Sequence, residues 1–410
     1  MGIGPGGQRH PRIFLLESVE TPIIVNRRFI ELARAAWRVA LAVWLGAAIV
    51  AGAQKRPAKP DLAKAVPAAD PPVVRARWHV LGAHPLALFY YADDARGRES
   101  LEAHARAMTL LAPQSYWLDH EGFVHGQLRA EVWAVERHTG LALMPLVLNP
   151  RFDRATAHAL LHNVKAQERA AMYLAYLAKR DHYVGWQLDF ENIDPDDKLA
   201  YAEFVERVSA RLHRDRRLLS VALVPRFSDT YPDNPAGQFQ TGEWGAAYDY
   251  RALGRTADFL TLMAYDQHSS LTPPGPVAGY DWVKAALDYA VRCMPPSKLL
   301  LGVPFYGREW VETSQGTTSH SLSYKDLRRF LNDPGSAPQW DENSRTTWFQ
   351  TRDGEIQHTA WFDDARSLRE KLQLVESYHL RGFAAWRLGV EDPEFWSLEE
   401  GKPVIRERYP

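Results

Sequence analysis

The chain has 410 residues, 46% of them hydrophobic and 11% aromatic, which suits one large α/β domain with an additional export segment. Its 49 Lys and Arg nearly balance its 50 Asp and Glu, so the composition disfavours nucleic acid as the main partner. A single cysteine, Cys293, excludes an intrachain disulfide and a cysteine-based zinc site.

Residues 1–53 predict an N-terminal export signal or a membrane anchor. Basic residues from Arg27 to Arg38 precede a short apolar run, 39–53, which ends in the small residues Ala51-Gly52-Ala53. This order is typical of a secretory signal, although the preceding segment is long for a signal peptide and the apolar run is short for a membrane span. We therefore expect an exported protein, periplasmic or extracellular, and leave cleavage or retention as an anchor open. Residues 54–77, rich in Pro, Ala and Lys, predict a disordered linker.

From residue 78 to residue 400, apolar strand-like runs alternate with amphipathic helical stretches. The expected strands are Leu86–Tyr91, Ser115–Leu118, Leu141–Leu148, Gly185–Phe190, Leu219–Val224, Phe259–Ala264, Leu299–Pro304 and Gly382–Trp386. The expected helices between them include Ala155–Lys179, Lys198–Arg214, Asp281–Arg292 and Asp364–Tyr378. Alternation predicts a parallel sheet, and eight units predict a (β/α)8 TIM barrel as the catalytic domain. A doubly wound open sheet is the alternative, but no glycine-rich phosphate loop follows the first strand.

The segment at about 311–362 interrupts this alternation. One helix is expected at Tyr324–Leu331, and two alternating runs, Arg345–Gln350 and Glu355–Trp361, flank an Asp-Gly turn typical of a hairpin. We interpret the segment as a small α+β insertion after the seventh strand, and residues 401–410 as a C-terminal tail.

The end of the fourth strand carries an unusual pair of acids. Side chains alternate along a strand, so Gln187, Asp189 and Glu191 are expected on one face of a hydrophobic run. Buried carboxylates are costly, and adjacent ones raise each other's pKa, which can keep a proton donor at neutral pH. A salt bridge at the strand end is the alternative.

Other polar and aromatic residues follow later strands. Barrel chemistry lies at the carboxyl ends of the strands, so these residues are expected to converge on one rim, as a concave sugar site requires. They are Tyr265 and Asp266 after the sixth strand, Tyr306 and Arg308 after the seventh, and Trp386 at the end of the eighth. Met263 lies within the sixth strand itself.

Four segments in this order resemble glycoside hydrolase family 18, the family of chitinases and N-acetylglucosaminidases, over roughly residues 78–398. They are VGWQLDFE at 184–191, LMAYDQH at 262–268, the path from 275–279 to 304–308, and FAAWRLG at 383–389. The sequence DFEN at 189–192 resembles the corresponding segment in the bacterial branch of the family, which includes spore and cell-wall peptidoglycan hydrolases. The chain departs from the family's acidic signature at Val184 and Gln187, and Gln187 cannot titrate.

The resemblance implies a retaining reaction in which the substrate's 2-acetamido group is the nucleophile. Glu191 would then be the general acid and base, Asp189 would hold the acetamide N–H, Tyr265 would donate to the acetamide oxygen, and Trp386 would form the floor of the sugar site. Gln187 is expected to support the acids.

The remaining site residues keep two interpretations each. Met263 packs either beside the acetamide methyl or in the core. Asp266 bonds a sugar hydroxyl or caps the strand end. Tyr306 and Arg308 reach the cleft, or Arg308 pairs with an acid of the insertion. No cofactor and no metal are expected.

The resemblance implies a polysaccharide substrate containing N-acetylglucosamine, of chitin or peptidoglycan type, for a protein expected to be a monomer. A non-hydrolytic chitinase-like carbohydrate-binding protein of the cell envelope is the alternative. Retention of Glu191 favours the enzyme.

Overall fold

The computed structural model describes residues 86–231, 239–332 and 336–401. The predicted export segment, the linker and residues 402–410 of the tail lie outside the described residues. Within the described ranges, no helix combines the length and the apolar character needed to cross a membrane.

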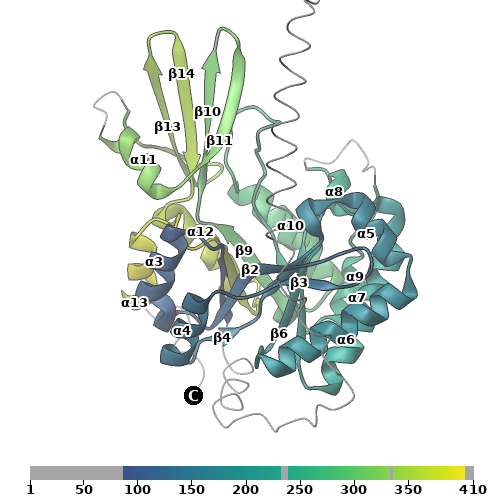
Figure 1. Cartoon of the computed structure of the whole chain (residues 1–410). Coiled ribbons are helices and arrows are strands. Elements are labelled where there is room, and N and C mark those ends of the chain that lie inside the picture. Colours follow the sequence, from purple (N-terminus) through teal and green to yellow (C-terminus); the bar gives the residue numbers. More distant parts are fainter. Residues whose placement is uncertain (1–85, 232–238, 333–335, 402–410) are drawn as a thin grey trace, which may run out of the picture. The chain divides into compact units, whose positions relative to one another are not determined.

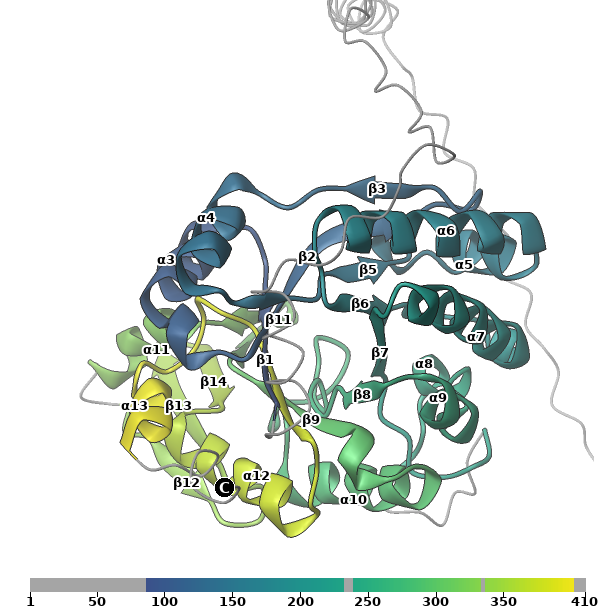
Figure 2. The same ribbon diagram turned by 90° about the horizontal axis from the view of Figure 1, so that it is seen from below.

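Eight parallel strands form a closed barrel, which confirms the predicted fold (Figure 2). Around the ring, β1 pairs with β15, the order continues through β9, β8, β7, β6 and β5 to β2, and β2 pairs again with β1. The strands are β1 (Leu86–Tyr91), β2 (Leu110–Leu118), β5 (Leu146–Leu148), β6 (Gly185–Asp189), β7 (Leu218–Leu223), β8 (Phe259–Leu262), β9 (Leu299–Pro304) and β15 (Gly382–Trp386).

The third barrel strand differs from the single run predicted at Leu141–Leu148. It divides into β4 (Ala142–Leu143) and β5, because Pro145 lies between them and has no N–H to donate. The second strand begins at Leu110 rather than Ser115, and Pro113 pairs in register with Tyr91 of β1. A short antiparallel strand, β3 (Val124–Gly126), is added to the outer edge of β2.

Helices surround the barrel (Figure 1). They are α3 (Ala95–His104), α4 (Ala130–Thr139), α5 (Arg154–Leu161), α6 (Val164–Arg180), α7 (Lys198–Arg214), α8 (Glu243–Ala246), α9 (Tyr250–Thr256), α10 (Tyr280–Cys293), α12 (Ala365–Ser377) and α13 (Glu394–Gly401). The predicted helix Ala155–Lys179 is in fact two helices, α5 and α6. The break occurs because Asn163 starts a new helix, and its side chain accepts the N–H of Ala166 at 3.2 Å.

Two apolar layers stabilise the barrel. The large layer lies between the strands and the helices, and a smaller cluster that includes Leu88, Leu110, Met144 and Leu300 is formed by residues of the barrel strands. Because both faces of the sheet are buried, the strands read as continuous apolar runs.

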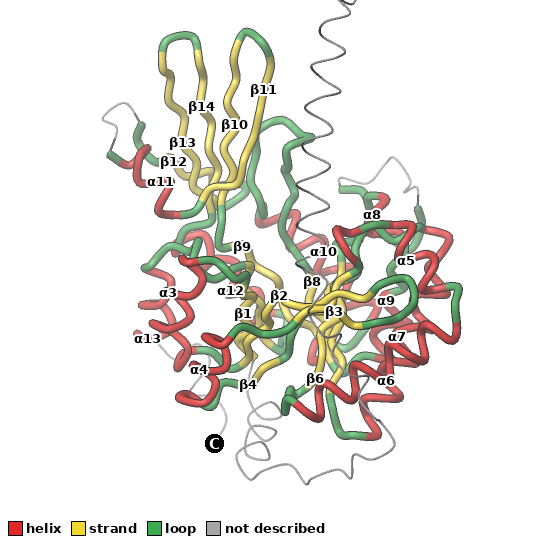
Figure 3. Tube along the Cα trace, in the orientation of Figure 1, coloured by secondary structure: helices red, strands yellow, loops and turns green. Residues whose placement is uncertain are grey.

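The predicted insertion after the seventh barrel strand is also confirmed, and its strand pairing begins at Gly307. It consists of β10 (Gly307–Thr313), β11 (Gly316–Leu322), α11 (Tyr324–Leu331), β12 (Gln339–Asp341), β13 (Thr346–Asp353) and β14 (Ile356–Phe362). The strands form an antiparallel five-stranded sheet in the order β11-β10-β14-β13-β12. Its long hairpins project from the barrel (Figure 3), and Gly354, with φ of +60°, allows the tight β13–β14 turn.

Candidate active site

The two acids lie where β6 meets the loop leading to α7. Asp189 is the last residue of β6 and is 4% exposed, whereas Glu191 is half-buried and lies two residues beyond the strand. The predicted strand Gly185–Phe190 therefore ends one residue early. Strand alternation puts Gln187 and Asp189 on the same face of β6, but it does not determine the position of Glu191. The position of Glu191 depends on the loop instead.

Asn149, which follows β5, holds the backbone of Glu191 from both sides. The Glu191 N–H donates to Asn149 Oδ1 at 3.0 Å, and Asn149 Nδ2 donates to the Glu191 carbonyl at 2.9 Å. Asn149 is 1% exposed, so water does not compete for these bonds. One amide side chain thus fixes the direction in which the Glu191 carboxyl leaves the loop.

Neighbouring residues fix the loop on either side of Glu191. The Tyr248 hydroxyl donates to the Phe190 carbonyl. Asn192 has φ of 54°, a left-handed conformation that asparagine tolerates better than most residues. Its side-chain oxygen accepts from Arg154 Nη2 at 2.9 Å, and its amide donates to the Phe152 carbonyl at 3.1 Å. The acid is therefore held by a preorganised loop rather than by a mobile one.

Burial raises the pKa of both acids. It raises the pKa of Asp189 from 3.8 to about 7. Burial, followed by the negative charges of Asp189 and Asp266, raises the pKa of Glu191 well above 4.5. An acid whose pKa is raised toward neutrality can hold a proton and release it in a reaction, as general acid catalysis requires.

Gln187 lies beneath the acids and is fully buried. Its Nε2 donates to Ser220 Oγ at 2.9 Å and to Thr261 Oγ1 at 3.0 Å. Among the described residues, Gln187 Oε1 and Asp189 Oδ1 are buried acceptors without a hydrogen-bond partner. Buried acceptors are normally satisfied, so an unsatisfied carboxylate oxygen at a barrel rim is available to an N–H group of a ligand.

A cavity of about 360 Å³ brings together four of the predicted binding residues: Asp266, Tyr306, Arg308 and Trp386. The Tyr306 hydroxyl donates to Asp266 Oδ1 at 2.5 Å. The Asp266 carboxylate therefore binds a side chain of the cavity wall and does not cap the end of its strand. The ring of Tyr306 lies edge-on to that of Tyr265, with centroids 6.4 Å apart, which connects the cavity to the residues after β8.

The predicted residues differ in their immediate surroundings. The Trp386 ring is 5.3 Å from that of Tyr90, which belongs to the first barrel strand. Burial raises the pKa of Tyr265 well above 10, so its hydroxyl remains a hydrogen-bond donor. Met263 is 8% exposed and packs in the core. Arg308 donates to Ser319 at 3.3 Å, and no ion pair with an acid of the described insertion is present.

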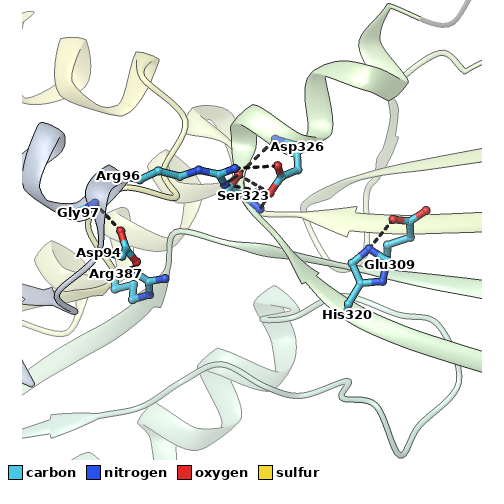
Figure 4. Close-up of polar contacts among 8 residues, drawn as sticks. All are labelled: Asp94, Arg96, Gly97, Glu309, His320, Ser323, Asp326 and Arg387. Carbon is cyan, nitrogen blue, oxygen red and sulfur yellow. Dashed lines mark hydrogen bonds and ion pairs between the residues drawn. The ribbon is translucent and has the colours of Figure 1, made fainter.

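Sequence reasoning missed the contacts that join the insertion to the barrel (Figure 4). Arg96 at the start of α3 donates to Ser323 Oγ at 2.6 Å and to both oxygens of Asp326 at 3.1 Å. Beside it, Arg387 donates to Asp94 at 2.5 Å. The Ser-x-x-Asp capping box at the start of α11 could have been found from the sequence, but its partner Arg96 is 230 residues away.

A closed (β/α)8 barrel with two acids, one buried at the carboxyl end of a strand and one half-buried in the loop that follows, beside an aromatic cavity, is an arrangement typical of glycosidases. The model of the family "Glycosyl hydrolases family 18" matches residues 153–391, more than half of the chain. The chain therefore belongs to glycoside hydrolase family 18 and is a glycosidase.

Named relatives agree with this assignment. The chain is 28% identical over 310 residues to the cortical fragment-lytic enzyme of Bacillus subtilis, with 73% of this chain and 70% of the relative covered. A chitinase of Chromobacterium violaceum has a similar structure, with a TM-score of 0.70 and 28% identity over 77% of this chain and 98% of that one. The spore cortex-lytic enzyme SleL of Bacillus megaterium matches with a TM-score of 0.68 and 26% identity, covering 77% and 73%.

Proposed function

We propose that the protein hydrolyses β-linked glycans containing N-acetylglucosamine, of chitin or peptidoglycan type, with retention of anomeric configuration. The observation that carries the proposal is the pairing of a buried, unsatisfied carboxylate oxygen on Asp189 with a second acid, Glu191, whose pKa is raised. A 2-acetamido sugar presents the N–H that the first acid can accept and the glycosidic oxygen that the second can protonate.

In the first step, the acetamide oxygen attacks the anomeric carbon of its own sugar while Glu191 gives its proton to the leaving glycosidic oxygen. The C–O glycosidic bond breaks, and an oxazolinium ion forms. Asp189 accepts the acetamide N–H and stabilises the positive charge. Glu191, now a carboxylate, takes a proton from water. The water oxygen attacks the anomeric carbon from the face that the leaving group occupied, and this opens the oxazolinium ring with retention of configuration. A positioned acid and base of this kind contributes roughly 10²–10⁴-fold.

Two other residues support the acetamide and the sugar ring. Tyr265, kept protonated by burial, donates its hydroxyl to the acetamide oxygen. Trp386, half-buried at the end of β15, provides an apolar surface for the C–H face of the sugar. Gln187 fixes the base of the site through Ser220 and Thr261 and carries no proton in the reaction.

The wall of the cavity favours a glycan that carries some negative charge. Its lining includes three arginines, Arg96, Arg308 and Arg387, and two acids, Asp266 and Asp326. A third acid, Asp94, binds Arg387, so the charges balance and the preference rests on Arg308. Arg96 and Arg387 are engaged by carboxylates, whereas Arg308 donates only to Ser319 in the hydrogen bonds observed among described residues. A peptidoglycan strand, whose stem peptides carry carboxylates, fits this wall better than neutral chitin. The cortical fragment-lytic relatives support the same preference.

A parallel digest tests the proposal. Purified peptidoglycan and chitin would each be incubated with the enzyme, products identified by mass spectrometry, and the first anomer formed followed by NMR. We expect β-products from glycans with an intact acetamide, and competitive inhibition by a thiazoline analogue of the oxazolinium ion. An initial α-anomer, or hydrolysis of de-N-acetylated glycan at the same rate, would contradict substrate assistance. Binding without any cleavage would instead indicate a carbohydrate-binding protein.

We also propose that the protein is exported and acts as a monomer in the cell envelope or outside it. The proposal is supported by the basic and apolar pattern of residues 27–53. Amino-terminal sequencing of protein from its native cells tests it: a mature chain starting at Gln54 indicates a cleaved signal, whereas a chain retaining 39–53 in the membrane fraction indicates an anchor. Unprocessed protein in the cytoplasm would contradict export.

A further inference from the structure

Two histidines and one aspartate form a compact cluster on the outside of the barrel. His158 belongs to α5, His162 directly follows that helix, and Asp197 ends the loop between β6 and α7. The ligand atoms of these three residues all lie within 4.8 Å of one another. The prediction of no metal site did not take this pair, four residues apart, into account.

Helical spacing explains why the two imidazoles meet. Residues four apart in a helix lie on the same face, and the two rings are 4.4 Å apart between centroids. Both face the same carboxylate: His158 Nδ1 lies 2.9 Å from Asp197 Oδ2, and His162 Nε2 lies 2.7 Å from Asp197 Oδ1. The edge of a tetrahedral zinc site is about 3.3 Å for bonds of about 2.0–2.1 Å. The two nitrogen–oxygen separations are hydrogen-bond distances, roughly 0.4–0.6 Å shorter than that edge, so the three side chains need to open only slightly to admit an ion.

Asp197 is placed for this cluster rather than for its own helix. It occupies the N-cap position of α7, yet its side chain makes no capping hydrogen bond there. The carboxylate is 2% exposed and points to the two histidines, which are 58% and 54% exposed. A buried anion facing two accessible imidazoles leaves one side open for a solvent ligand.

A second cluster of histidines around one acid, within the described part of the insertion, lacks this character. In the insertion, His320 contacts Glu309 (Figure 4). His358 also contacts Glu309, but the guanidinium of Arg329 occupies the same carboxylate and excludes a second cation. Within the helix α5, the one Lys or Arg is Arg154, which is engaged by Glu243 at 2.7 Å and by Asn192.

We propose that His158, His162 and Asp197 bind a divalent transition-metal ion, Zn²⁺ in the first instance. Two imidazole nitrogens and one carboxylate oxygen suit Zn²⁺, Ni²⁺ and Cu²⁺, whereas Mg²⁺ and Ca²⁺ require more oxygen ligands. The two ring protons move to the other nitrogen of each imidazole, so both rings stay neutral when the ion binds.

The ion would fasten the loop that carries Glu191. That loop runs from the end of β6 to Asp197 and is already tied to the start of α5 by Arg154 and Asn192. Coordination would tie its other end to the same helix. The site therefore acts as a positioning and stabilising element, separate from the hydrolytic step and independent of the proposed substrate.

Metal titration of the full chain tests the proposal. After treatment with a chelator, wild type and the double variant His158→Gln with His162→Gln would be titrated with Zn²⁺ by isothermal calorimetry. Glutamine can still hydrogen-bond to Asp197 but is a poor zinc ligand. We expect wild type to bind one more equivalent than the variant, or to bind that equivalent at least roughly a hundredfold more tightly, since even outer partners contribute about 10–100-fold.

A matched control and a second readout complete the design. His213→Gln alters another half-exposed histidine bonded to an acid, Asp258 at 2.9 Å, and should leave the additional equivalent intact. At a hundredfold excess of Zn²⁺ over Kd, the melting temperature of wild type should rise by on the order of 5 °C. Mg²⁺ should give no such rise. Equal stoichiometry and affinity in wild type and the double variant, with both folded by circular dichroism, would overturn the proposal.

Discussion

Replacing Asn149 by alanine should displace Glu191 without removing any group that reacts. The substitution deletes two hydrogen bonds to the Glu191 backbone, of 3.0 and 2.9 Å, at a site where Asn149 is 1% exposed. A buried N–H or carbonyl left without a partner costs about 1–3 kcal/mol, so the two together should lower the free energy of unfolding by roughly 2–6 kcal/mol. For a domain of this size, that corresponds to a fall in Tm of roughly 4–12 °C.

The same substitution should lower kcat, because a misplacement of about 1 Å at a catalytic group can reduce the rate by roughly a hundredfold. The assay is turnover of a chromogenic N-acetylglucosamine oligomer, with thermal unfolding measured on the same samples. Asn163→Ala is the matched control, since it removes the cap of α6 and should cost about 1 kcal/mol with kcat unchanged. If Asn149→Ala kept wild-type kcat, or lost only as much stability as Asn163→Ala, the reasoning about the loop would be refuted.

Three further predictions concern charge at the site. Between about pH 4 and 7 the folded protein holds a proton on Asp189 that the unfolded chain has released, so stability falls as pH rises through this range, by about 4 kcal/mol at most. Asp189→Asn should therefore raise Tm at pH 8 and leave it unchanged below pH 4; an equal Tm at pH 8 would argue against the burial effect. Gln187→Glu adds a negative charge below Asp189, which should raise the pKa of the acids and shift the basic limb of the pH profile of kcat/KM to higher pH. An unchanged profile would contradict this reasoning. Arg96→Ala should raise KM for long glycans several-fold while changing stability by about 1 kcal/mol or less, because Arg96 and Asp326 are both largely solvent-accessible; an unchanged KM would show that this bridge does not shape the cleft.

The barrel could be predicted from the sequence because most of its strands are buried on both faces and therefore read as short apolar runs. The hairpin of the insertion could be predicted from its alternation and its Asp-Gly turn, which the pairing of Asp353 with Ile356 confirms. Local chemistry that interrupts a run was harder to foresee. Pro145 divides the third strand, and Asn163 divides one long amphipathic stretch into two helices.

In the candidate site, too, some residues could be predicted from the local sequence pattern, whereas others meet only when the barrel has closed. Strand period and position at strand ends were sufficient to single out Asp189 and Trp386, and the structure places Trp386 in the wall of the cavity. Asn149 could not be identified, since it meets Glu191 only when neighbouring strands of the barrel align their ends. Tyr248 is similarly remote, 58 residues from the Phe190 carbonyl that it bonds. Such supporting groups carry no periodic signal, because they lie in loops.

The role of Glu191 as proton donor is the central claim, and turnover by Glu191→Gln tests it most directly. Glutamine preserves the size of the side chain and the backbone bonds to Asn149 but carries no transferable proton. With an N-acetylglucosamine oligomer whose leaving group is a sugar, we predict a fall in kcat of about 10²–10⁴-fold, and a smaller fall when the leaving group is a good one such as nitrophenolate. Equal turnover of both substrates by wild type and Glu191→Gln would contradict the account.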